Sequence, residues 1–164
     1  MDHEGLTYLQ VSTAIAGFIT NPAGDWSNGE YGYGVLAFEG GIEIIAQRLA
    51  RRLCDNCKEV RDIPREALEK EGFTAEELDQ DITIFGPKDK GCKQCNDGYK
   101  GRVGIFQVME VSETMGRIIM EGGNAMQIAE QAAKEGVIDL RQAGLNKVKD
   151  GVTSLEEVNR VTIE

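Results

Sequence analysis

The alternation of apolar and polar positions predicts a chain of short helices with a few strands. Residues 42–53 carry apolar side chains at helical spacing and are predicted to form a helix with one buried face. Those apolar positions are Ile42, Ile45, Ala46, Leu49 and Leu53. Tyr31, Tyr33, Val35 and Ala37 occupy alternate positions and predict a strand over residues 31–37, and further strands are predicted at residues 82–85 and 103–111.

Residues typical of helix ends mark the remaining elements. Pro64 suits the first turn of a helix that Gly72 ends, and Thr74 with Glu77 forms a capping box for the next one. Four more helices follow residue 111, and each is preceded by a side chain that can cap it. These capping residues are Ser112, Asn124, Asp139 and Ser154, the last within a second capping box that includes Glu157. Short capped helices in succession predict a compact α-helical subdomain.

Composition and charge narrow the classes of function. The 164 residues are 41% apolar and carry a formal net charge of −10, which argues against nucleic acid as a partner. Residues 5–20 are fairly apolar, but polar residues interrupt them, and no apolar run reaches the roughly 18 residues of a membrane span. This segment is therefore predicted to be a buried helix or strand. Residues 1–40 contain no Lys or Arg, and we assign them no function.

The four cysteines form two C-x-x-C pairs, Cys54 with Cys57 and Cys92 with Cys95. Two such turns can enclose Zn²⁺ in a tetrahedral shell that leaves no position for water or substrate, so the predicted metal site is structural. The alternatives are less favoured. A dithiol redox site needs one C-x-x-C near a βαβ pattern, a disulfide framework suits a secreted chain with a signal peptide, and an iron–sulfur site usually has a denser run of cysteines. The 34-residue gap between the pairs exceeds the usual 15–20 or so, which predicts a folded insert.

The predicted fold class is α+β, with a small tetracysteine zinc-binding subdomain of short strands and helices followed by a compact α-helical C-terminal subdomain. The predicted boundaries place an N-terminal segment at residues 1–41, the zinc-binding subdomain at 42–111 and the helical subdomain at 112–164. Cations near the cysteines are favoured because a Zn²⁺ ion with four thiolates carries a charge of −2. They are also candidate contacts for an acidic partner: Arg48, Arg51, Arg52, Lys100 and Arg102.

No nucleotide-binding loop of the form G-x-x-x-x-G-K-[ST] occurs in the chain, and no catalytic constellation is visible. The glycines of residues 98–104 are better explained by a tight turn that leads into a strand. We therefore expect no ATP hydrolysis by this chain alone, and leave open whether it belongs to an enzyme.

Residues 42–164 resemble the C-terminal part of the traffic ATPases that drive type IV pilus assembly and type II secretion. The resemblance rests on AQRLARRLC at 46–54, both C-x-x-C pairs, GYKGR at 98–102, GIF at 104–106, LRQ at 140–142 and GVTSLEEV at 151–158. The last residues are most similar to the pilus assembly branch. Residues 1–40 match no part of the family, which suggests a truncated or fused product.

This resemblance implies a cytoplasmic protein that works beneath the inner membrane as part of a hexamer. Family members combine a RecA-like motor domain, which uses ATP and Mg²⁺, with this zinc-bearing region, and they act on an inner-membrane platform protein. The implied role is a zinc-stabilised module that relays ATP-driven motion, with Zn²⁺ as its structural cofactor. The alternative is a free-standing zinc-binding adaptor or interaction module.

Overall fold

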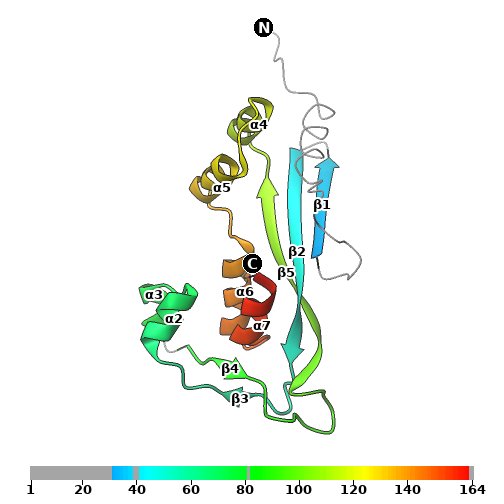
Figure 1. Cartoon of the computed structure of the whole chain (residues 1–164), viewed down its shortest axis with the longest axis vertical. Coiled ribbons are helices and arrows are strands. Elements are labelled where there is room, and N and C mark those ends of the chain that lie inside the picture. The colour runs from blue at the N-terminus through cyan, green and yellow to red at the C-terminus, as the bar shows by residue number, and fades with distance from the viewer. Residues whose placement is uncertain (1–30, 39–40, 81, 163–164) are drawn as a thin grey trace. The chain divides into compact units, whose positions relative to one another are not determined.

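The computed structural model describes residues 31–38, 41–80 and 82–162. In these residues the fold is α+β, as predicted, with six helices and antiparallel strands (Figure 1). Contacts divide the chain into two compact units, one of Met1–Gln47 with Gln107–Ile138 and one of Arg48–Phe106 with Asp139–Glu164. The division predicted at residues 41 and 111 differs from this one and stays a prediction. The apolar segment 5–20 lies outside the described residues, and within them no helix is long and apolar enough to span a membrane.

Strands β1, β2 and β5 form a three-stranded sheet in the order β1-β2-β5. Its strands are β1 (Tyr31–Phe38), β2 (Gly41–Leu53) and β5 (Tyr99–Glu110). The amide of Val111 donates to the carbonyl of Ile42, and the amide of Cys54 donates to the carbonyl of Gly98, both at 2.8 Å. Strands β2 and β5 are therefore antiparallel, and the end of β2 meets the start of β5. The strands predicted at 31–37 and 103–111 are confirmed.

The helix predicted at 42–53 is wrong, because these residues form strand β2. Ile42, Ala46 and Ala50 are buried, with exposed fractions of 6%, 7% and 0%. A spacing of four residues places side chains on one face of a helix and also on one face of a strand, so these positions do not distinguish the two. Pairing with β5 decides the outcome, since the backbone groups of β2 bond across the sheet.

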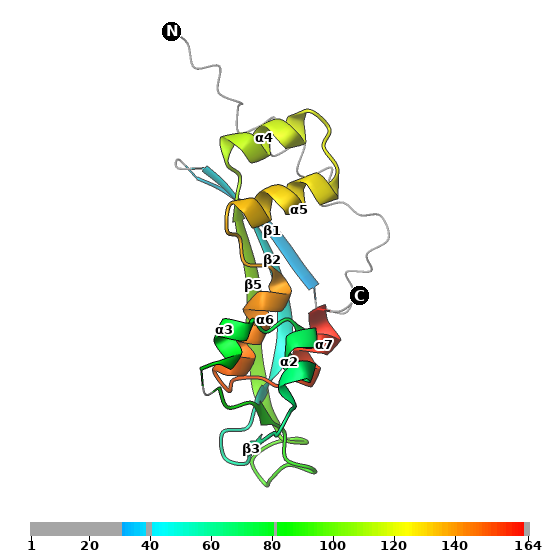
Figure 2. The same cartoon turned by 90° about the vertical axis from the view of Figure 1, so that its left-hand side faces the viewer.

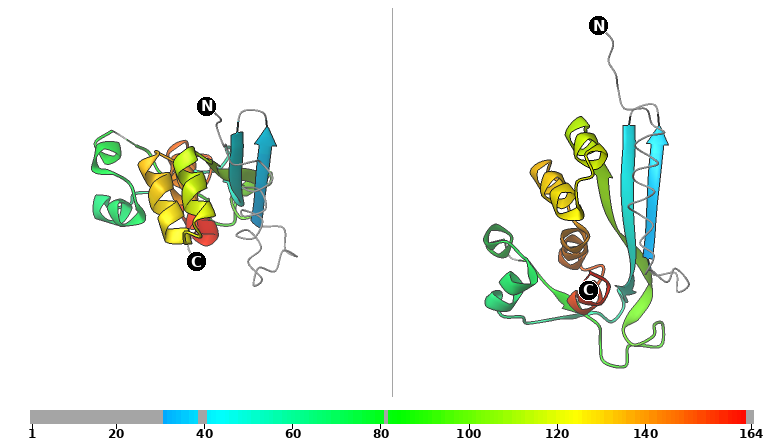
Figure 3. Two further views of the ribbon diagram at one scale, coloured as in Figure 1. Left: turned by 90° about the horizontal axis from the view of Figure 1, so that it is seen from above. Right: turned by 45° about the horizontal axis from the view of Figure 1, so that its top comes forward.

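In the first unit, helices α4 (Glu113–Met120) and α5 (Ala125–Lys134) pack side by side (Figure 3). The Ser112 hydroxyl accepts from the amide of Met115, and Asn124 forms a capping box with Gln127, so both predicted N-caps are confirmed. A small apolar cluster joins these helices to the start of β2 and the end of β5. Its buried members are Ile42, Met115, Ile119 and Ala132.

In the second unit, the insert between the cysteine pairs packs on the C-terminal helices. The insert contains strands β3 (Glu59–Val60) and β4 (Phe85–Gly86) and helices α2 (Arg65–Glu71) and α3 (Ala75–Leu78). The C-terminal helices are α6 (Leu140–Lys149) and α7 (Leu155–Thr162), which lie beside α2 and α3 (Figure 2). The buried core that joins them includes Leu68, Phe73, Ile105, Leu145 and Val158. The insert is thus a folded lobe, as the long gap predicts.

Ion pairs fasten this lobe at two points. The Arg141 guanidinium donates to the Glu71 carboxylate at 2.5 Å, and the Lys149 ammonium pairs with Glu77. Two helix ends predicted in this unit are confirmed. Gly72 ends α2 with a φ of +106°, and Thr74 begins α3 with a capping box. The strand predicted at 82–85 is wrong in extent, because only Phe85 and Gly86 pair, with β3.

Candidate metal centre

The two cysteine pairs meet because they flank the paired ends of β2 and β5. Cys54 directly follows β2, and the carbonyl of Cys54 accepts from the amides of Cys57 and Lys58 at 3.0 and 2.9 Å. Cys92 and Cys95 form a second turn, closed by the bond from the amide of Cys95 to the carbonyl of Cys92 at 3.2 Å. We call these turns, 54–57 and 92–95, the first and second knuckles. Antiparallel pairing places them together although 34 residues separate them.

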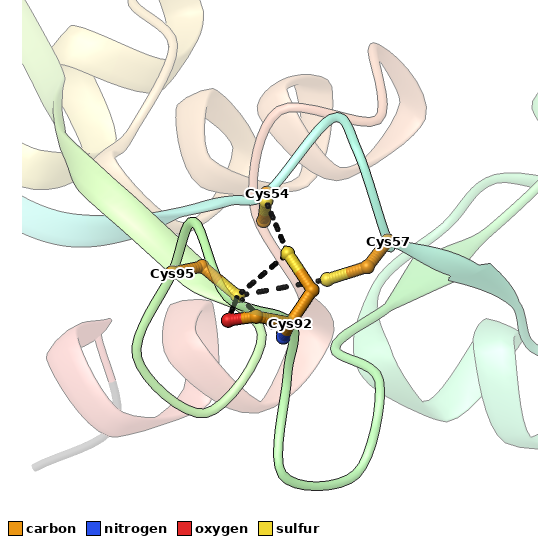
Figure 4. A group of neighbouring side chains, drawn as sticks. All are labelled: Cys54, Cys57, Cys92 and Cys95. Atoms are coloured by element: carbon orange, nitrogen blue, oxygen red, sulfur yellow. Dashed lines mark hydrogen bonds between the residues drawn. The ribbon is translucent and has the colours of Figure 1, made fainter.

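The four sulfur atoms form a compact group, all within 4.8 Å of one another (Figure 4). Cys54 Sγ lies 3.9 Å from Cys92 Sγ, and Cys95 Sγ lies 3.6 Å from both Cys57 Sγ and Cys92 Sγ. A tetrahedral ion with Zn–S bonds of about 2.3 Å requires sulfur atoms about 3.8 Å apart. The sulfur group therefore has the dimensions of a tetrahedral thiolate site and can hold one thiophilic divalent cation.

The surroundings of the sulfur atoms favour the thiolate form of Cys92. The backbone amide of Cys92 donates to Cys95 Sγ at 3.1 Å, and the side-chain amide of Asn56 donates to Cys92 Sγ at 3.5 Å. A backbone amide at Gln94, followed by Asn56, lowers the pKa of the Cys92 thiol to about 6. Burial and the neighbouring sulfur atoms raise the pKa of Cys57 to about 12. Binding of a cation to all four thiolates must therefore release protons, so its affinity depends on pH.

Close packing fixes the second knuckle. Gly91 has a φ of +60°, and a β-carbon there would lie 2.6 Å from the amide nitrogen of Gly98 and 2.7 Å from Cys95 Sγ. Only glycine has neither the strain nor the clash at this position. The loop before Cys92 thereby lies directly against the turn that leads into β5.

The connection between α6 and α7, together with the first turn of α7, bonds to residues that flank both knuckles. We call residues 151–157, which include this first turn, the docking loop. The amide of Leu53 donates to the carbonyl of Val152 at 2.8 Å, and the Lys58 ammonium donates to the carbonyl of Gly151 at 2.9 Å. The hydroxyls of Tyr99 and Ser154 lie 2.8 Å apart, both buried. The residues just before and just after the first knuckle, and the strand after the second, therefore bond to one loop.

Glu157 is a buried carboxylate that sequence reasoning assigned to a capping box. Its own amide donates to Ser154 Oγ at 3.3 Å, as predicted, but its carboxylate accepts from the amide of Arg51 at 2.8 Å rather than from that of Ser154. The guanidinium of Arg51 donates to it at 2.9 and 2.7 Å, and that of Arg160 at 3.1 Å. Burial opposes ionisation, but these hydrogen bonds outweigh it and lower the pKa of Glu157 to about 2.

The five cations predicted near the cysteines differ in their environments. Arg48 is buried, with an exposed fraction of 7%, and it interacts with other groups of the chain. Arg51 pairs with Glu157, and its guanidinium lies 4.1 Å from the centre of the Tyr99 ring. Arg52 is exposed and pairs with the exposed Asp55, at 3.2 Å. The remaining two, Lys100 and Arg102, are exposed near the start of β5. The sequence did not reveal that Lys58 bonds to the docking loop. The signal that could have pointed to this residue was its position directly after Cys57.

Comparison with known proteins finds relatives among the proteins of type IV pilus assembly and type II secretion. A family model described as Type II/IV secretion system protein matches residues 40–160. The chain is 54% identical over 119 residues to the Type IV pilus assembly ATPase PilB of Pseudomonas aeruginosa, covering 73% of this chain and 20% of that protein. It is 38% identical over 124 residues to the Type II secretion system protein E of Dickeya dadantii, covering 75% and 23%. The chain spans about a fifth of the length of these relatives.

Proposed function

The chain belongs to the type II/IV secretion system protein family, and we propose that it is the zinc-stabilised C-terminal module of a type IV pilus assembly motor. The observation that carries this proposal is the group of four sulfur atoms, which are spaced for one tetrahedral cation and whose flanking residues Leu53, Lys58 and Tyr99 bond to the docking loop. Identity of 54% to a pilus assembly ATPase, against 38% to a secretion protein, favours the pilus branch.

In this proposal the metal makes the paired end of β2 and start of β5, the insert and helices α6 and α7 respond to force as one body. Zn²⁺ supplies four strong bonds between segments far apart in sequence, and these bonds form only when both knuckles are folded. The rest of the parent protein would supply the RecA-like motor domain, with its ATP and Mg²⁺, and the hexamer. The module would then pass motion to an inner-membrane platform protein from the cytoplasmic side.

Arg52, Lys100 and Arg102 are the proposed contacts to an acidic surface of the motor domain or the platform. Their side chains are exposed. Arg51 is unsuitable for testing such a contact, because a carboxylate at this position would face the buried carboxylate of Glu157. We therefore restrict the test of contacts to the three exposed cations.

Metal analysis of the purified chain tests the first part of the proposal. We expect one zinc ion per chain, and a fall in melting temperature when a strong chelator is added. The Cys54→Ser, Cys57→Ser double variant should purify without zinc and should not respond to chelator. Chain that purifies without metal, binds none on titration and melts unchanged in chelator would refute a structural zinc site. Thiols that react freely with Ellman's reagent without metal release would favour the dithiol alternative.

A chimera tests the role in a motor. The segment of the Pseudomonas aeruginosa relative that aligns with this chain is replaced by residues 42–162, in a strain that lacks its own copy. We expect surface pili, and loss of pili when the chimera carries the two serines at positions 54 and 57. A chimera that accumulates normally and hydrolyses ATP but assembles no pili would count against the relay role. Charge reversal of Arg52, Lys100 and Arg102 in the working chimera tests the contacts separately.

A further inference from the structure

The docking loop bonds to the backbone or side chains around both knuckles without supplying any sulfur ligand. Leu53 and Lys58 bracket the first knuckle, and they donate to the successive carbonyls of Val152 and Gly151, at 2.8 and 2.9 Å. Tyr99 follows the second knuckle, and its hydroxyl lies 2.8 Å from Ser154 Oγ. One short loop thus fixes three points of the chain that together determine where the knuckles lie.

Two buried side chains hold the docking loop against β2. The Thr153 hydroxyl is fully buried and donates to the carbonyl of Arg51 at 2.8 Å. The Glu157 carboxylate is 2% exposed and accepts from the amide and the guanidinium of the same Arg51. Arg51 lies three residues before Cys54, so these bonds fix the direction in which β2 enters the first knuckle.

We propose that the docking loop is a positioning element for the metal site, and that Glu157 is its principal positioning residue. The loop holds the four cysteines in the geometry that binds zinc. A variant that loses the contacts of the loop therefore binds zinc more weakly, although it keeps every thiolate. Coupling between two sites is reciprocal, so bound zinc in turn stabilises the docking of the loop and of α7. Groups that hydrogen-bond directly to metal ligands change metal affinity by about 10–100-fold, and the docking loop acts one residue further away, so we expect an effect at the lower end of that range. The inference rests on the zinc site of the proposed function.

The Glu157→Gln substitution separates a positioning role from a simple electrostatic effect, because the two predict opposite changes in the strength of zinc binding. Zinc binding displaces thiol protons and leaves the site with a charge of −2, so removing a nearby negative charge should by itself stabilise the zinc-bound state and slow dissociation. Loss of positioning should weaken it, because a neutral amide cannot accept the same charge-assisted bonds from Arg51 and Arg160. Glu71→Gln is a matched control, since Glu71 pairs with Arg141 on α6 in the same unit and bonds to neither knuckle.

The test measures zinc dissociation from the full chain, with a chromogenic chelator in excess, for wild type, Glu157→Gln and Glu71→Gln. We expect dissociation to be about tenfold faster in Glu157→Gln and unchanged within about twofold in Glu71→Gln. Equal rates in wild type and Glu157→Gln, slower dissociation in Glu157→Gln, or equal acceleration in both variants would each overturn the proposal. If the wild-type chain binds no zinc at all, the proposed function fails instead.

Tyr99→Phe provides a milder variant if Glu157→Gln does not fold. It removes only the hydroxyl that reaches Ser154, so we expect zinc dissociation to accelerate by about threefold, less than in Glu157→Gln. Hydrogen exchange of the wild type, with and without zinc, examines the reciprocal effect. Metal removal should speed exchange in α7 more than in α2. Equal increases in the two helices, or an unchanged dissociation rate in Tyr99→Phe, would contradict the coupling.

Discussion

Replacing Arg51 by methionine should destabilise the folded chain far more than replacing its neighbour Arg52. The Arg51 guanidinium makes two bonds to Glu157, at 2.9 and 2.7 Å, and lies 4.1 Å from the Tyr99 ring. Arg52 makes an ion pair, at 3.2 Å, with Asp55, and both of these side chains are at least half exposed. Methionine keeps much of the apolar stem of either arginine, so the comparison isolates the charged group.

The expected magnitude follows from the burial of the two partners. Breaking a fully buried ion pair costs about 3–5 kcal/mol, because the remaining charge has no compensation. Glu157 is 2% exposed, but Arg51 is 49% exposed, and both Arg160 and the amide of Arg51 still bond to the carboxylate in the variant. Solvent screening and these remaining bonds reduce the cost, so we expect about 2 kcal/mol for Arg51→Met. For Arg52→Met we expect less than about 0.5 kcal/mol.

Urea unfolding at pH 7 with saturating zinc measures both variants. A double-mutant cycle with Glu157→Gln isolates the pair, and we expect a coupling energy of about 1–2 kcal/mol. Equal losses of stability in Arg51→Met and Arg52→Met would refute the reasoning. So would a coupling energy near zero, since the half-exposed guanidinium would then contribute nothing to the buried carboxylate.

Three further outcomes are expected from the same structure. Gly151→Ala should cost about 1–3 kcal/mol in urea unfolding, because Gly151 has a φ of +65° and a β-carbon would lie 3.0 Å from the Phe85 ring; an unchanged midpoint would contradict this. Glu157, with its pKa lowered from 4.5 to about 2, contributes stability that is complete above pH 4.5 and lost as the pH falls toward 2. The stability difference between wild type and Glu157→Gln should therefore shrink over that window, whereas a constant difference would show that ionisation is not its cause. Thr74→Ala removes a capping box and should cost about 1 kcal/mol, with faster hydrogen exchange confined to α3 as its signature.

Local features of the sequence determined much of what the structure contains. The C-x-x-C spacing identified all four members of the sulfur group, because two residues between cysteines are enough for one turn. Short side chains before apolar segments located helix starts at Ser112, Asn124 and Asp139, since a cap bonds to amides two or three residues away. Such features depend on neighbours in sequence and can be read without the fold.

Features that depend on distant partners could not be read in this way. The apolar positions of residues 42–53 fit a helix or a strand, and pairing with β5 made them a strand. The spacing of Glu157 from Ser154 predicted a capping box, yet its carboxylate bonds to Arg51, 106 residues away in sequence. A local pattern names the bonds that a side chain can form, whereas the fold decides which partner is present.

The sequence by itself therefore determined the sulfur group, the helix ends, the α+β class and the resemblance to the type II/IV secretion family. Only the tertiary structure decided that β2 is a strand and that the docking loop bonds to residues that flank both knuckles. It also decided that Arg51 pairs with the buried carboxylate of Glu157. The physical reason is that turns and caps are stabilised by bonds over a few residues. Strand pairing and buried charges, in contrast, are stabilised by groups that only folding brings together.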